Sequence, residues 1–156
     1  MSAPAKTAIV VGVDHRIQYT NADCGQEWTT DIRALEEHLV GIATKLDADL
    51  VAEEFNEECV KRNAATGCTV RDAARRAGRA HLFCDPDTAE RTRAGISTPG
   101  QREEEWLRRA LKAGPSRLLF VCGDAHVDSL ADRLLAAGYQ VTVDSRNWGN
   151  DWAFKN

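Results

Sequence analysis

The sequence has no apolar run of the roughly 20 residues needed to cross a membrane. Its N-terminus, MSAPAKTAIVVGV, also lacks the apolar segment of a signal peptide. We therefore expect a cytoplasmic protein that makes no membrane contact. The five cysteines are odd in number and form no C-x-x-C pair, so the pattern predicts neither a disulfide framework nor a zinc ribbon. We expect reduced thiols.

Three common functional motifs are also missing: G-x-G-x-x-G, G-x-x-x-x-G-K-[ST] and G-x-S-x-G. Dinucleotide-binding, P-loop and serine-hydrolase functions therefore lose their usual support, and phosphate or nucleotide binding ranks last among the functions considered. The formal net charge of -4 argues against a nucleic-acid partner. The arginines at positions 71, 75, 76 and 79 recur at helical spacing, which is typical of a solvated helix face.

The composition is that of one folded domain. The chain has 156 residues, of which 43% are hydrophobic and 28% charged, so we expect a single domain with short tails at 1–5 and 145–156. Apolar runs predict strands at 7–13, 49–52, 80–84, 117–122 and 139–143. Helical patterns cover 29–46, 56–65, 69–78, 101–113 and 127–137, with Thr29 or Thr30 as the first cap, and residues 86–100 form a loop. This alternation predicts a three-layer α/β fold, with a mainly parallel sheet of about five strands and helices on both faces.

Ionisable residues follow four of the predicted strands, where ligands bind in open α/β sheets. They are Asp14-His15, Glu53-Glu54, Asp85 and Asp124 with His126. A sheet made only for packing has no need of charged groups there, because charge is costly to hold near a core. Neighbours on a strand point to opposite faces, so only one of Glu53 and Glu54 is expected to enter the site. We expect Asp124 to cap the following helix.

These residues are compatible with two kinds of hydrolytic chemistry. Two imidazoles and carboxylates, His15, His126, Glu53 and Glu54, are a ligand set for a divalent metal such as manganese, cobalt or zinc. The same groups also suit a site without metal, in which a histidine polarised by a carboxylate activates water. The residue types alone leave both open.

Other reactive residues are set aside. His38 lies in the middle of a predicted helix and His81 opens a predicted strand, so neither is placed in the site. Cys84 and Cys122 fall at strand ends, where an inert buried thiol is the more common role.

Two G-x-x-H boxes, Gly12-Val13-Asp14-His15 and Gly123-Asp124-Ala125-His126, each follow a predicted strand. With Glu53-Glu54 after the second strand and Arg102 upstream of the second box, this arrangement resembles the TraB/TIKI superfamily, including its GumN and erythromycin-esterase-like relatives. The resemblance spans residues 8–143 and rests on about five specific positions.

This resemblance implies a hydrolase that cleaves an ester or amide in a small-molecule or peptide substrate. TIKI-like members use manganese or cobalt, whereas esterase-like members activate water with a histidine. Carried over, His15 and His126 bind metal or act as base, and Glu53 or Glu54 ligates the metal or orients the histidines. Arg102 pairs with a glutamate or stabilises an oxyanion.

A second hypothesis belongs to a different class: a non-catalytic regulatory or partner-binding domain that keeps the family's fold. The chain is short for the family, and its aromatic tail, residues 148–154, offers a surface for a partner or a second copy of the chain. Packing of this tail on its own domain is the alternative.

Overall fold

The computed structural model describes residues 4–149, and its centre is a five-stranded sheet. The strands are β1 (Lys6–Val13), β3 (Leu50–Glu53), β5 (Ala80–Phe83), β6 (Arg117–Gly123) and β7 (Tyr139–Trp148). They lie in the order β5-β3-β6-β1-β7, and every neighbouring pair is parallel. A separate antiparallel pair joins β2 (Tyr19–Thr20) to β4 (Gly67–Cys68), in segments where the sequence predicts no strand.

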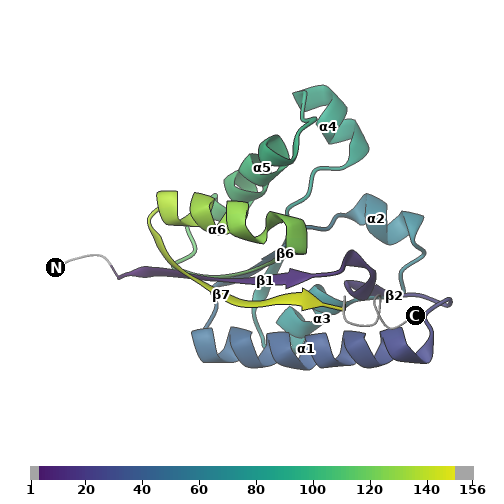
Figure 1. Cartoon of the computed structure of the whole chain (residues 1–156). Helices are drawn as coiled ribbons and strands as arrows, with labels where there is room; N and C mark the ends of the chain where they lie inside the picture. Colours follow the sequence, from purple (N-terminus) through teal and green to yellow (C-terminus); the bar gives the residue numbers. More distant parts are fainter. Residues whose placement is uncertain (1–3, 150–156) are drawn as a thin grey trace.

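Helices cover both faces of this sheet (Figure 1). On one face lie α1 (Gln26–Leu46) and α3 (Thr69–Arg76), and on the other lie α5 (Pro99–Leu111) and α6 (Val127–Ala136). The short elements are α2 (Glu57–Arg62), α4 (Thr88–Ala94) and the 3-10 turns η1 (His15–Ile17) and η2 (Asp124–His126). The predicted three-layer α/β fold is confirmed.

Alternation along the strands creates two cores. Val10 and Phe120 face α5 and α6, where they pack with the buried Trp106. Val11 and Val121 face α1 and α3, and pack with Leu35. Adjacent residues of a strand therefore serve opposite cores, which decides where each of two consecutive glutamates points.

The strand order reverses direction at the centre of the sheet. The chain runs outward from β1 to β3 and β5, and then returns so that β6 lies between β3 and β1. The carboxyl ends of β1, β6 and β3 thus lie side by side at the point where the direction reverses, and this is where α/β sheets hold their ligands. The turn η1 and helix α2 lie beyond this end of the sheet (Figure 1).

Residues 86–100 are not the predicted loop. Helix α4 occupies part of this segment, and Asp87 caps it by accepting a hydrogen bond from the backbone N–H of Glu90. Helix α5 begins at Pro99, two residues earlier than predicted, and Thr98 caps it. Proline suits the first helical position because its missing N–H has no partner there anyway, so the prolines and glycines of this segment bound helices.

The start of α1 and the end of β7 also differ from the prediction. Helix α1 begins at Gln26, and the hydroxyls of Thr29 and Thr30 bond carbonyls one turn back, so neither threonine caps it. Strand β7 continues to Trp148 through bulges in its pairing with β1, so residues 145–148 belong to the sheet and not to a tail.

None of the helices formed by residues 4–149 has the length and apolar character needed to cross a bilayer.

Candidate active site

Glu54 is the carboxylate at the centre of the site. It directly follows β3, its side chain is 3% exposed, and it lies on the α5 and α6 side of the sheet. Its Oε1 accepts a hydrogen bond from the backbone N–H of Gly123 at 2.9 Å, and its Oε2 accepts one from Arg102 at 2.7 Å. Of the two consecutive glutamates, Glu54 is therefore the one that joins the two histidine boxes.

The histidines of the two boxes approach Glu54 from opposite sides. Nε2 of His15, in η1, lies 3.4 Å from Oε1 of Glu54. Nε2 of His126, in η2, lies 3.6 Å from Oε2 of the same carboxylate. The His15 ring is 52% exposed and the His126 ring only 12%, so solvent reaches the site mainly from the His15 side.

Gln18 fixes the orientation of the His15 ring. The Gln18 side chain is fully buried, and its amide nitrogen faces two oxygens, Oε1 of Glu53 at 3.0 Å and the backbone carbonyl of Glu54 at 3.4 Å. Its Oε1 therefore faces Nδ1 of His15, 2.6 Å away, and accepts the proton of that nitrogen. A neutral His15 thus presents an unprotonated Nε2 to the site.

Glu103 holds His126 in the same tautomer. Its Oε2 lies 2.6 Å from Nδ1 of His126, and its Oε1 accepts hydrogen bonds from Ser129 and Arg133. Burial opposes ionisation of Glu103, but the hydrogen bonds from His126, Ser129 and Arg133 prevail and lower its pKa below the usual value. An ionised Glu103 only accepts, so Nδ1 of His126 carries the proton and its Nε2 is turned toward Glu54.

Glu53 points to the opposite face and takes no direct part in this arrangement. Its fully buried carboxylate lies 2.5 Å from Nε2 of His81 and accepts a hydrogen bond from Gln18. Burial raises the pKa of Glu53, while the neighbouring His81 imidazole opposes the rise. His81, which was not predicted to belong to the site, thus connects through Glu53 and Gln18 to His15.

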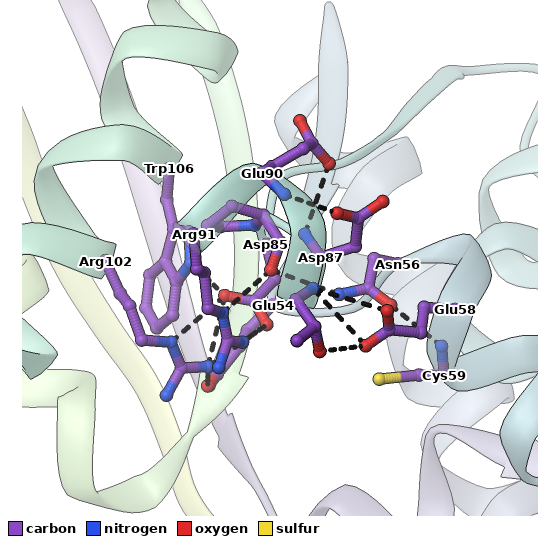
Figure 2. Close-up of polar contacts among 12 residues, drawn as sticks. Glu54, Asn56, Glu58, Cys59, Asp85, Asp87, Glu90, Arg91, Arg102 and Trp106 are labelled. Carbon is purple, nitrogen blue, oxygen red and sulfur yellow. Dashed lines mark hydrogen bonds and ion pairs between the residues drawn. The ribbon is translucent and has the colours of Figure 1, made fainter. Parts of the chain in front are cut away.

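Arg102 binds two carboxylates at once. Besides Glu54, it donates to Oδ1 of Asp85 through Nε at 3.2 Å and through its terminal nitrogen at 3.1 Å. Arg91 and the indole N–H of Trp106 also donate to Asp85, at 2.6 and 2.8 Å. Figure 2 shows Arg91 and Arg102 both directed at Asp85, and Arg102 also bonded to Glu54. The predicted pairing of Arg102 with a glutamate is present, and Asp85 is a second, shared anchor.

Each box's glycine makes room for the other box. A Cβ at Gly123 would lie 2.7 Å from Nε2 of His15 and 3.3 Å from Oε1 of Glu54. A Cβ at Gly12 would lie 2.4 Å from Oδ1 of Asp124 and 2.7 Å from Val127. Glycine is thus required for close approach in both boxes, and the two motifs form one packed unit.

Asp124 does not cap the following helix as predicted. Its Oδ1 accepts a hydrogen bond from the backbone N–H of Asn147 at 2.7 Å, and helix α6 has no side-chain cap at its first turn. Because Asn147 lies near the end of β7, Asp124 connects this strand to the second box.

The nearby thiols are buried: desolvation raises the pKa of Cys84 to about 12 and that of Cys122 well above its usual value.

The predicted metal ligands do not come together as one ligand group. Glu53 is turned away, and Arg102 already places a positive charge on Oε2 of Glu54. Within residues 4–149, no group of three or more His, Cys, Asp or Glu side chains is arranged to hold a metal ion. The donor set therefore does not fit a metal in this arrangement.

A pocket of about 310 Å³ opens beside His15, Glu54 and Arg102. Its other lining residues come from η1 and β2, from the segment between β3 and α2, from α2 and its C-cap, and from α4 with the turn before it. Its size is at the lower end of the range for small-molecule sites. His126 does not line the pocket, and its Nε2 lies 3.6 Å from Oε2 of Glu54, which does.

Sequence reasoning missed two residues that orient the histidines. Glu103 shares the buried face of α5 with Trp106 and Ala110, and this i, i+3, i+7 spacing was visible in the sequence. Gln18 lies in a polar segment with no such pattern, so nothing in the sequence marks it out.

Comparison of the chain with models of known protein families, with curated proteins and with solved structures found no match in any of the three.

Proposed function

We propose that this protein is a hydrolase of the erythromycin-esterase type within the TraB/TIKI superfamily, which cleaves an ester or amide by activating water with His15 and without a metal. One observation carries the proposal. Two imidazoles, both held with Nδ1 protonated, turn their Nε2 atoms toward one buried carboxylate at the edge of a small-molecule pocket. The packing of each G-x-x-H glycine against the other box supports the family resemblance.

In the proposed reaction His15 is the general base, because its side chain is 52% exposed and lines the pocket. Nε2 takes a proton from water as the water oxygen bonds to the substrate carbonyl carbon. The carbonyl electrons move to oxygen, and the resulting oxyanion faces the guanidinium of Arg102. Collapse of this intermediate breaks the C–O or C–N bond, and the leaving group takes the proton back from His15.

The other residues position these groups. Gln18 keeps the His15 tautomer, since its carbonyl oxygen binds the Nδ1 proton. Glu54 holds Arg102 at the pocket wall, and Asp85 fixes the same guanidinium from a second side. His126, with Glu103 behind it, supports Glu54. Gln18, Glu54, Asp85 and Arg102 each form hydrogen bonds with at least two other groups, which is the arrangement that keeps a site rigid.

The partner-binding alternative receives less support from the described residues. Trp148 packs on His38 of α1 at 4.9 Å between ring centres, and its indole N–H donates to Ser145. Within residues 4–149, Leu135 is the only large hydrophobic residue that is exposed, so no apolar docking patch is formed there. The rest of the aromatic tail, from residue 150 on, lies outside the described residues.

The proposal predicts turnover of carboxylic esters or amides. Untagged protein is incubated with a panel of small esters, lactones, amides and short peptides, and the acid product is measured by mass spectrometry. In ¹⁸O-labelled water we expect one labelled oxygen in the acid product, because water is the attacking group. A panel with no product above the protein-free background would contradict the proposed function.

A further inference from the structure

The pocket beside the proposed active site carries more positive than negative charge. Four arginines line it, against the two carboxylates of Glu54 and Asp85, in a chain whose formal net charge is -4. The four arginines are Arg16, Arg62, Arg91 and Arg102. A concave surface of one sign raises the local concentration of ligands of the opposite sign.

Three of these arginines are held by carboxylates. Arg102 bridges Glu54 and Asp85, and Arg91 donates to Asp85 at 2.6 Å. Arg16 forms a close ion pair with Asp14. These contacts use the guanidinium groups to build the pocket wall, and they neutralise most of its charge.

Arg62 is different. Its side chain is 63% exposed at the end of α2, and within residues 4–149 its one ion pair is with Glu58 at 3.9 Å. Its other contact is with the Sγ atom of Cys59 at 3.1 Å, and thiol sulfur is a weak acceptor. A guanidinium has five N–H donors in a planar fork that matches a carboxylate or a phosphate. Most of these donors remain available to a ligand in the pocket.

Two aromatic rings also form part of the pocket wall. The rings of Tyr19 and Phe55, both lining residues, stack with their centres 6.1 Å apart and their planes 16° from parallel. Such a surface suits a planar or apolar body. His15, Arg62 and this wall thus lie around one small pocket, each suited to a different part of the same molecule.

We propose that the pocket binds a small organic anion, with Arg62 holding its carboxylate or phosphate and the Tyr19–Phe55 wall holding its apolar body. If the proposed hydrolase function is right, the substrate is an ester or amide that carries such an anionic group. The substrate class rests on that function, whereas the anion site does not.

Two kinds of measurement test this. The first compares hydrolysis of monobenzyl succinate, which has one free carboxylate, with that of benzyl methyl succinate, which is neutral. The second measures binding of benzoate and phenyl phosphate by NMR titration, which needs no turnover and separates carboxylate from phosphate. Arg62→Gln is the test variant. Lys61→Gln is the matched control, because Lys61 is an exposed cation on the same helix that does not line the pocket.

We expect wild type and Lys61→Gln to prefer the anionic ester by about tenfold in kcat/KM, and Arg62→Gln to lose this preference. At least one of the two anionic probes should bind about tenfold more weakly to Arg62→Gln. Equal kcat/KM for the two esters, or a preference for the anionic ester that Arg62→Gln retains, would overturn the proposed substrate class. Neither result would contradict the hydrolase function. Probe binding that Arg62→Gln weakens, without hydrolysis of any ester, would support the anion site and contradict the hydrolase function. Probe binding with the same affinity in wild type and Arg62→Gln would overturn the anion site.

Discussion

Replacing His15 by alanine is expected to lower kcat/KM by about 10³-fold on any ester or amide that the protein hydrolyses, because the variant lacks the proposed general base. The side chain is 52% exposed, but the variant leaves Oε1 of the fully buried Gln18 without its donor, so we expect the free energy of unfolding to fall by about 1–3 kcal/mol. Initial rates at several substrate concentrations and urea denaturation measure the two effects separately.

His38 provides the matched control for this substitution. Its Nε2 lies 2.6 Å from Oδ2 of Asp144, so it too is a histidine paired with a carboxylate, but it lies on α1 outside the site. We expect His38→Ala to keep wild-type kcat/KM. Equal losses in the two variants, or full activity in His15→Ala, would contradict the role given to His15.

Replacing Arg102 by methionine is expected to lower the free energy of unfolding by about 3 kcal/mol. Methionine keeps much of the side-chain volume, but it removes the cation that lies between Glu54 and Asp85, whose side chains are 3% and 5% exposed. Both carboxylates then remain buried beside each other with fewer donors. Urea denaturation followed by circular dichroism measures the loss.

Arg108→Met is the control for this loss, because Arg108 lies on the same helix and pairs with Glu105 while 64% exposed. Ion pairs at such exposed positions contribute about 0–1 kcal/mol. We therefore expect Arg108→Met to be nearly as stable as wild type. If the two variants were equally stable, Arg102 would not be the cation that holds the buried carboxylates together.

The central strands β1, β3 and β6 could be predicted from sequence because they are buried on both faces and are therefore largely apolar. Residues 86–100 were harder, since Gly95 and Pro99 resemble loop residues when read singly. Gly95 ends α4 in the left-handed conformation and Pro99 begins α5, and both roles belong to helix ends. The spacing from Asp87 to Glu90 was the available signal for a capped helix.

The site was predictable only in part. Alternation along a strand showed that Glu53 and Glu54 point to opposite faces, but which face holds the histidines depends on the strand order, and the sequence does not reveal that order. The pairing of His81 with Glu53 likewise depends on the register of β5 against β3. Gln18 bonds His15 three residues before it, but its buried contacts are with Glu53 and Glu54 of another segment, and no local pattern in the sequence marks such contacts.

The central claim, that His15 and not a metal activates the water, is tested most directly by measuring metal content and turnover on one sample. Untagged protein is analysed by elemental mass spectrometry, and its ester or amide turnover is measured before and after chelation and after reloading with manganese, cobalt or zinc. We predict turnover that chelation does not reduce and no metal near stoichiometric amounts. Near-stoichiometric metal that His126→Ala loses, together with turnover that disappears on chelation and returns on reloading, would contradict the claim.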